Sequence, residues 1–111
     1  MALPGELYPE LWLSGPDGAS LVERPDGGDF PGATIAPPLS SRIGGRTRVT
    51  VNLANDAIGY IIPKTQYDVD APHAYLVEGQ YGEGASLGYE SAPAVEGAVV
   101  EMMDLVAREG R

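Results

Sequence analysis

The sequence predicts an α+β fold: a small, loop-rich chain with a few β-strands that form part of a mixed sheet and one C-terminal amphipathic helix. Fifteen glycines and ten prolines among 111 residues are about twice the usual share and place much of the backbone in turns. Residues 47–54 alternate between apolar and polar side chains, which predicts a strand. Apolar residues recur at helical spacing over 92–108, which predicts an amphipathic helix.

The first element, residues 3–13 (LPGELYPELWL), favours one or two helical turns. Pro4 suits a first helical turn, and Leu7 and Leu11 are four positions apart. Pro9 argues against a longer helix. Because most glutamates are exposed, the simplest interpretation of Glu6 is a solvated side chain at the start of this helix.

Residues 14–46 form a Gly/Pro-rich irregular segment. The stretches Pro16-Asp17-Gly18 and Pro25-Asp26-Gly27-Gly28 predict turns, since proline presets φ and glycine accepts a positive φ. Such a long irregular segment is unusual in a self-contained domain. It is typical of a chain that lies across the surface of something larger.

The strand predicted at 47–54 has Val49, Val51 and Leu53 on one face, which we expect to face the core. A turn then leads to a second extended piece at 59–63. Tyr60 lies at its start, and the simplest interpretation of this residue is a ring packed within a strand.

The C-terminal helix, residues 92–108, has recognisable ends. Ser91 is a suitable N-cap, Pro93 lies in the first turn and Gly110 ends the helix. We expect the methionines at 102 and 103 to fill the core. The predicted apolar stripe consists of Val95, Val99, Met102 and Val106.

The charge of the chain disfavours two classes of partner. With 7 basic and 16 acidic residues, the net charge is −9, and both nucleic acids and anionic membranes require a basic face. Arg42, Arg46 and Arg48 are either a small anion-facing patch or, as the sequence favours, the solvated flank of a strand. The absence of cysteine excludes disulfides, a thiolate nucleophile and a cysteine-based zinc site.

Nothing in the sequence predicts membrane insertion or targeting. No apolar run approaches the roughly 18 residues needed to cross a bilayer, and the N-terminus lacks a signal-peptide pattern. The chain is therefore expected to be soluble, without a defined compartment: cytoplasmic, or secreted with a missing N-terminal part.

Two local patterns suggest chemistry. Residues 84–88 match the G-x-S-x-G nucleophile elbow around Ser86, but an elbow needs a histidine downstream, and His73 lies upstream. A Gly-rich turn is the favoured interpretation. Asp68 and Asp70 with His73 resemble a metal corner, although solvated loop acids are the commoner explanation.

Three stretches, in order, resemble the neutral/alkaline, non-lysosomal ceramidases and their bacterial relatives. The first is LPGE at 3–6, which resembles the P-G-E motif of that family. The second is LANDAIGYI at 53–61, which resembles its G-L-A-N-D-x-x-G-Y stretch. The third is QYGEGAS at 80–86, which resembles Q-x-Y-E-G-A-S with one extra glycine. The resemblance spans most of residues 3–100, and three motifs in the right order are more specific than any one.

The resemblance implies a zinc-dependent amidohydrolase that cleaves the N-acyl amide bond of ceramide. It assigns Glu6 and Tyr60 as zinc ligands and Tyr81 as the catalytic residue that polarises the scissile carbonyl. A carboxylate is an ordinary zinc ligand, and a phenol near the developing oxyanion would stabilise it. A lipid-like amide is the implied class of substrate.

The departures from the family pattern predict an incomplete site. The other zinc ligands of the family are upstream histidines, whereas His73 falls in no matching motif. The intervals from Glu6 to Asn55 and from Tyr60 to Tyr81 are also longer here. We therefore expect a fragment or subunit that forms the C-terminal portion of a larger catalytic domain. It would bind zinc only in a completed site, with the upstream half as partner, and would be inactive alone.

Two alternatives remain open. The chain could be a non-catalytic binding or assembly module that oligomerises or completes the sheet of a partner. A stand-alone hydrolase built around His73 or Ser86 is a weaker alternative, because no complete catalytic constellation accompanies either residue.

Overall fold

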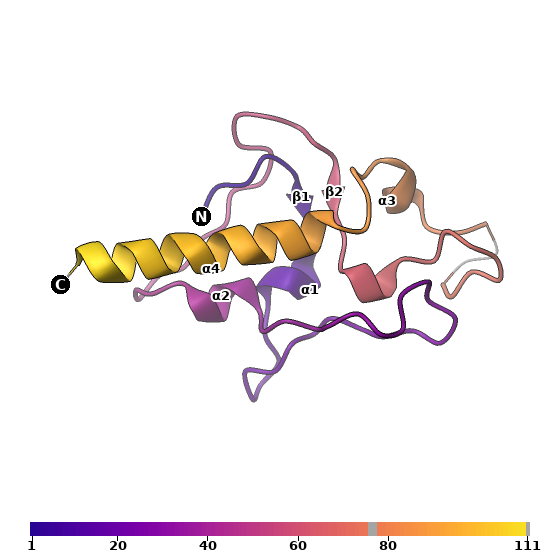
Figure 1. Cartoon of the computed structure of the whole chain (residues 1–111), viewed down its shortest axis with the longest axis horizontal. Coiled ribbons are helices and arrows are strands. Elements are labelled where there is room, and N and C mark those ends of the chain that lie inside the picture. The colour runs from indigo at the N-terminus through magenta and orange to yellow at the C-terminus, as the bar shows by residue number, and fades with distance from the viewer. Residues whose placement is uncertain (76–77, 111) are drawn as a thin grey trace.

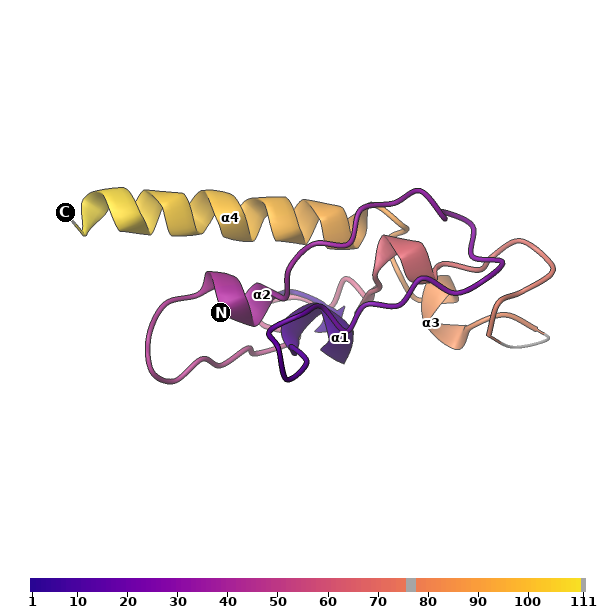
Figure 2. The ribbon, with the colours of Figure 1, turned by 90° about the horizontal axis from the view of Figure 1, so that it is seen from below.

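The longest element of the computed structural model, which describes residues 1–75 and 78–110, is helix α4, Ser91–Glu109. Figures 1 and 2 show α4 lying across a thin base that contains the short helices α1 (Pro9–Trp12) and α2 (Leu39–Arg42). The C-terminal end of α4 extends past this base. The molecule measures 51 × 33 × 21 Å, so its interior is only one layer of side chains deep between α4 and the base.

A two-stranded parallel sheet lies in the base (Figure 1). Strand β1, Glu6–Leu7, pairs with strand β2, Tyr60–Ile61. The backbone N–H of Glu6 donates to the Gly59 carbonyl at 2.9 Å, and that of Tyr8 donates to the Ile61 carbonyl at 3.1 Å. The chain is thus a small mixed α/β structure, as the sequence predicts, and the sheet that it forms by itself is parallel.

The expectation that residue 6 starts a helix is wrong. Glu6 lies in β1, and α1 begins only at Pro9. Proline is well suited to the first helical position because it lacks the N–H that would there be unpaired. The residues before it are left extended and can pair with β2.

The segment 47–54 also differs from the prediction. It forms a single parallel bridge, between Val51 and Ala2, and its apolar side chains face outward rather than into the core. The exposed fractions of Val49, Val51 and Leu53 are 57%, 53% and 48%. Leu53 then takes a positive φ of 54°, which ends the extended run. One backbone edge of this segment pairs with the N-terminus, but nothing in the described residues covers its apolar side chains.

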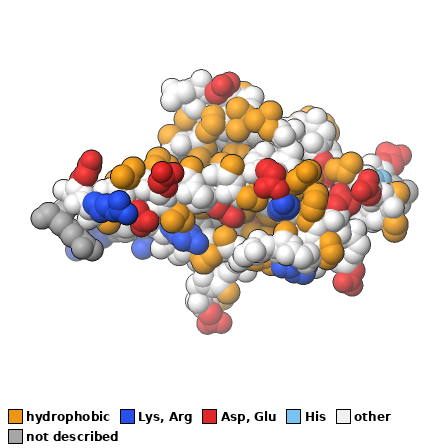
Figure 3. All heavy atoms as spheres, in the orientation of Figure 1, with side chains coloured by type: hydrophobic (Ala, Val, Ile, Leu, Met, Phe, Trp, Pro, Cys, Tyr) orange, Lys and Arg blue, Asp and Glu red, His pale blue; other side chains and the backbone are white. Residues whose placement is uncertain are grey.

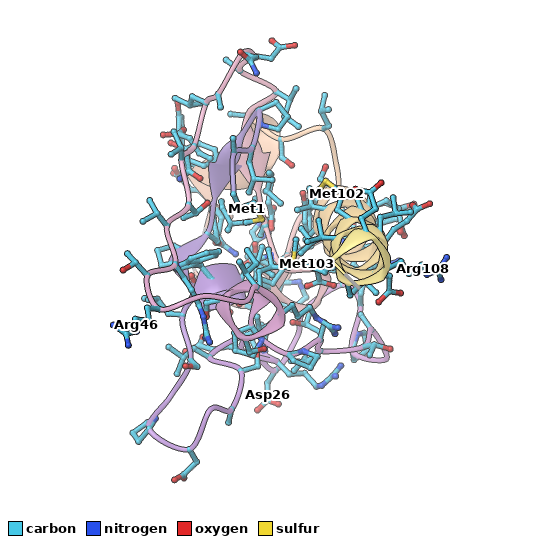
Figure 4. All side chains as sticks on the ribbon, turned by 90° about the vertical axis from the view of Figure 1, so that its left-hand side faces the viewer. Met1, Asp26, Arg46, Met102, Met103 and Arg108 are labelled. Atoms are coloured by element: carbon cyan, nitrogen blue, oxygen red, sulfur yellow. The ribbon has the colours of Figure 1, made fainter. Side chains whose placement is uncertain are left out.

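The core lies where α4 meets the base. One side of α4 supplies Ala92 and Val99, each 1% exposed, with Val95 and Met103 packed against the same cluster. Figure 4 shows Met103 on the side of α4 that faces the rest of the molecule, with Arg108 on the opposite side. The base contributes Leu3, Leu7, Leu11, Leu39 and Ile61.

The helix itself is confirmed to within a residue at each end, but its predicted stripe is only half right. Met102 and Val106 are 47% and 61% exposed. The side chains of α4 that contact the core are instead Ala92, Val95, Val99 and Met103. Beyond Met103 the helix extends past the base. Glu90 rather than Ser91 occupies the N-cap position, and no side chain caps the helix.

The irregular segment 14–46 contains both predicted turns and one unpredicted helix, α2. Gly18 and Gly27 have φ values of 75° and 85°, as turns of this kind require. The remaining short helices are the 3₁₀ turn η1, Lys64–Gln66, and α3, Tyr81–Gly84. Among the described helices, none has the length and hydrophobicity needed to cross a bilayer.

Candidate functional site

The parallel register brings Glu6 directly opposite Tyr60. The two residues are Cα partners, as are Leu7 and Ile61, and adjacent strands lie about 4.8 Å apart. Leu7 and Ile61 are 7% and 0% exposed and point into the core. Because successive side chains in a strand point to opposite faces, Glu6 and Tyr60 share the other, outward face.

Helix α3 adds Tyr81 to the same place. The backbone N–H of Tyr60 donates to the Ala85 carbonyl at 2.9 Å, which ties the start of β2 to the end of α3. The rings of Tyr60 and Tyr81 are 6.1 Å apart between centroids and nearly perpendicular, at 76°. The side chain of Tyr81 is 81% exposed. All three residues predicted for the site therefore lie together, although they come from distant parts of the chain.

A fourth residue, Tyr8, belongs to this group and was not predicted. Its ring lies 6.0 Å from that of Tyr60, at an interplanar angle of 74°. Tyr8 follows Glu6 by two positions in extended backbone, which is the spacing that puts two side chains on one face of a strand. We call Glu6, Tyr8, Tyr60 and Tyr81 the tyrosine–glutamate cluster.

Glycines make the close packing beneath the cluster possible. Gly59 has a φ of 91°, and a Cβ there would lie 1.9 Å from the Ala85 carbonyl oxygen. A Cβ on Gly5 would lie 2.7 Å from the Gly59 carbonyl oxygen, and one on Gly82 would lie 2.3 Å from the Tyr8 hydroxyl. The three glycines come from the separate stretches 3–6, 53–61 and 80–86, and these stretches can approach so closely because glycine has no side chain.

The electrostatics of the cluster keep its central phenols protonated. The negative charge of Glu6 raises the pKa of Tyr60, and burial and the neighbouring Tyr81 act in the same direction. Burial, followed by the charges of Glu10 and Glu83, raises the pKa of Tyr8. Both phenols are therefore hydrogen-bond donors at neutral pH.

The donor atoms fit part of a zinc site. Glu6 offers a carboxylate and Tyr60 a phenol on one face, and a bound cation would offset the carboxylate charge that disfavours a phenolate. Protein zinc sites have three or four protein ligands. Within residues 1–75 and 78–110, no group of three His, Cys, Asp or Glu side chains could hold a metal. Glu6 and Tyr60 are thus two oxygen-bearing side chains on one face, fewer than the three or four protein ligands that a zinc site needs.

The other residues that the sequence singled out have structural roles. His73 Nδ1 lies within hydrogen-bonding distance of the Asp68 carbonyl oxygen, and the fully buried Asp68 carboxylate accepts the Tyr75 backbone N–H at 3.0 Å. The hydroxyls of Ser86 and Tyr67 share a hydrogen bond of 2.8 Å. Ser86 follows α3 rather than a strand, so it does not form a nucleophile elbow.

Glu83 is the most perturbed carboxyl group near the cluster. Its Oε1 accepts the backbone N–H of Asp68 at 2.6 Å. Burial, and beyond it the charges of Asp68 and Asp29, raise the pKa of Glu83 to about 7. Burial also acts to raise the pKa of Asp68, but hydrogen bonds from Tyr75, Glu83 and Gln80 outweigh it and the net shift is downward. Below about pH 7, Glu83 is therefore mostly protonated, whereas the pKa of its neighbour Asp68 is held below the usual value.

No family model, curated protein or solved structure matches the chain. The case for a function therefore rests on the geometry of the tyrosine–glutamate cluster. Chemically, that cluster combines an anionic oxygen ligand, a phenol beside it and a second, exposed phenol able to donate a hydrogen bond.

Proposed function

We propose that this chain is the C-terminal portion of the catalytic domain of a ceramidase-like, zinc-dependent amidohydrolase, inactive by itself. The observation that carries the proposal is the cross-strand pairing of Glu6 with Tyr60, with Tyr81 packed against Tyr60. The resemblance in sequence requires these three side chains to meet, and composition or periodicity alone gives no reason for them to do so.

Each residue then has a definite task in the hydrolysis of an N-acyl amide. Glu6 and Tyr60 would hold the zinc, which when bound supplies Lewis acidity and an activated water. Tyr81, the most exposed phenol of the cluster, would donate a hydrogen bond to the oxyanion that develops on the scissile carbonyl. Tyr8 packs edge-on against Tyr60 and holds the orientation of its ring.

The remainder of the domain would supply what this chain lacks. Upstream histidines would complete the zinc site. Parallel strands are normally buried on both faces, so we expect β1 and β2 to continue into a larger mixed sheet. The exposed apolar side chains of Val49, Val51 and Leu53 would be covered by that part of the domain, and a lipid-like amide is the substrate class that fits the resemblance.

Reconstitution tests this proposal. The full 111-residue chain is mixed with a separately expressed upstream half of such a catalytic domain that carries the histidine ligands, and bound zinc is measured by mass spectrometry. We expect about one zinc per pair, and Glu6→Gln or Tyr60→Phe should weaken zinc binding at least ~10-fold, since each removes a ligand. Tyr81→Phe should keep the zinc and lower kcat about 100-fold.

The matched control is Tyr75→Phe, which likewise removes one phenolic hydroxyl but lies outside the cluster. A pair that binds no zinc would contradict the proposal. So would a pair that binds zinc equally well with glutamine at 6 and phenylalanine at 60.

A second candidate function is a non-catalytic assembly module that forms homo-oligomers. The observation that favours it is the outward-facing row Val49, Val51 and Leu53, which we call the apolar row. Arg46 and Arg48 lie beside the row in a chain whose net charge is −9, so a second copy would bring an acidic surface to a basic flank. Sedimentation velocity distinguishes this candidate, because it requires self-association of the chain without any other polypeptide.

A further inference from the structure

A cavity of about 370 Å³ is lined by Glu83 of α3 and by residues of the 29–30, 67–70 and 88–89 segments, and it includes no member of the tyrosine–glutamate cluster. Its walls carry three aromatic rings and three carboxyl groups, and no Lys or Arg side chain from the described part of the chain lines it. We call it the aromatic–acidic pocket. Its rings belong to Phe30, Tyr67 and Tyr89, and its carboxyl groups belong to Asp29, Asp70 and Glu83.

The three rings of the pocket pack against one another. Tyr67 stands nearly perpendicular to both other rings, at 76° to Phe30 and 86° to Tyr89, with centroids 6.5 and 6.3 Å away. The rings of Phe30 and Tyr89 are closer, at 4.5 Å and 38°. The rings thus pack against one another as one cluster, which presents aromatic surface to the cavity. Aromatic surface of this kind attracts quaternary ammonium groups.

The same rings already attract a cation within the molecule. The ammonium of Lys64 lies 5.2 Å from the Phe30 centroid and 5.0 Å from the Tyr89 centroid. Lys64 is itself paired with Glu90 and does not line the pocket. The rings of Phe30 and Tyr89 therefore already contact one cation of the chain, the Lys64 ammonium. That ammonium is not among the groups that line the pocket.

The acidic wall is held in place by the backbone. The carboxylate of Asp29 accepts the N–H groups of Val69 and Asp70, at 2.7 and 3.3 Å. The N–H of Asp29 in turn donates to the Tyr67 carbonyl at 2.8 Å. These bonds fix the 29–30 and 67–70 segments side by side, so rings and carboxylates keep their positions without a ligand.

We propose that the aromatic–acidic pocket binds an alkylated ammonium cation, such as choline or the trimethylated side chain of a lysine. The ring faces attract the cation through their quadrupoles. The carboxylates of Asp29 and Asp70 supply the opposite charge, and no Lys or Arg side chain from the described residues lines the pocket to offset it. The methyl groups bury apolar surface against the rings.

Binding to the full chain without metal tests this proposal independently of the zinc site. Choline, a short trimethyllysine peptide and the uncharged isostere of choline with carbon in place of nitrogen are titrated at ~0.15 M salt, where long-range attraction is screened. NMR shifts or calorimetry give the dissociation constants. We expect at least one of the two cations to bind about 10-fold more tightly than the isostere, and the tighter one indicates the source of the ligand.

Variants locate the site. Tyr89→Leu removes a ring face and should weaken binding of the preferred cation about 10-fold, whereas Tyr89→Phe keeps the face and should change binding less than about twofold. Asp70→Asn should weaken binding about threefold, and Asp17→Asn, in an exposed turn outside the pocket, should leave it unchanged.

Three results would overturn the proposal: equal affinity for both cations and the isostere, no binding of either cation, or binding that Tyr89→Leu and Asp70→Asn leave unaltered. The comparison of the cations with the isostere uses the unmodified chain. It therefore tests whether the chain prefers an alkylated ammonium cation even if a variant fails to fold.

Discussion

Gly59 is the residue on which the geometry of the tyrosine–glutamate cluster most depends. Its positive φ and its contact with the Ala85 carbonyl let Tyr60 hydrogen-bond to the end of α3. A side chain at this position would require both a strained backbone and a displaced α3. Tyr60 and Tyr81 would then separate.

We expect Gly59→Ala to lower the free energy of unfolding by at least ~2 kcal/mol more than Gly18→Ala does. Gly18 is the matched control because it also has a positive φ, 75°, but has nothing within 4 Å of an added Cβ. Urea unfolding of both variants checks this. Equal losses of stability would mean that the contact with Ala85 is not tight.

Glu83 makes the folded chain less stable as the pH rises, which is the reverse of the effect of a carboxyl group whose pKa is lowered by folding. Its pKa rises from 4.5 in the unfolded chain to about 7 in the fold, so the folded state binds the extra proton. The stabilisation is complete below about pH 4.5 and is lost as the pH rises toward 7. The carboxylates that face Glu83 are Asp68 and Asp29.

Glu83→Gln should therefore stabilise the chain at about pH 8 and have little effect near pH 4.5. Glutamine keeps an oxygen for the Asp68 N–H and can donate to the Asp68 carboxylate, as protonated Glu83 does. We expect a gain of about 1 kcal/mol at the higher pH, because solvent screens a partly exposed group and reduces the linkage energy. Thermal melts across this pH range measure it, and a gain that is independent of pH would contradict the assignment.

The members of the site were more predictable than their arrangement. Glu6, Tyr60 and Tyr81 each stand in a motif, so the sequence singles them out as candidates for a site. Their proximity depends on the register of β1 with β2, which pairs segments far apart in the sequence. Tyr8 was recognisable only once residues 6–8 were known to be extended rather than helical.

Helix α4 carries two different surfaces along its length. Near its start the helix covers the base, and Val99 is buried to 1% exposure. Past Met103 the base ends, and apolar residues such as Val106 face outward. The spacing of its apolar residues predicted the helix well, but a periodicity cannot tell how far the partner surface extends.

Matched truncations along α4 test this division. Val99→Ala should cost about 2 kcal/mol of unfolding free energy because it opens a cavity against the core. Val106→Ala should change stability by less than about 0.5 kcal/mol, since the side chain is 61% exposed. Equal losses at the two positions would indicate that the C-terminal part of α4 is covered in solution, as self-association would require.

The whole molecule has an asymmetric surface. Figure 3 shows hydrophobic side chains gathered on the upper part of one face, around the 49–58 segment, while acidic side chains are spread over α4. The apolar row contributes to this exposed hydrophobic surface, since its side chains are about half exposed. The alternation predicts a strand with a covered apolar face, but the segment forms a single bridge and its apolar side chains are exposed. Only tertiary contacts decide whether such a face is covered.

If the chain is an assembly module, the apolar row should hold copies together. Sedimentation velocity should then show dimers or larger species at micromolar concentration, and Val51→Lys should shift the population toward monomer. Thr47→Lys is the matched control, since it adds the same charge to an exposed position outside the row. A chain that remains monomeric until the upstream half is added would instead favour the ceramidase-like proposal.

The pairing of β1 with β2 also bears on how fast the molecule folds. Glu6 and Tyr60 belong to segments separated by nearly half the chain, so the tyrosine–glutamate cluster forms only after a long loop has closed. Parallel pairing of this kind is intrinsically slow compared with the local contacts of a helix. We therefore expect α4 to gain its structure early in refolding and the ring contacts of Tyr60 to appear last.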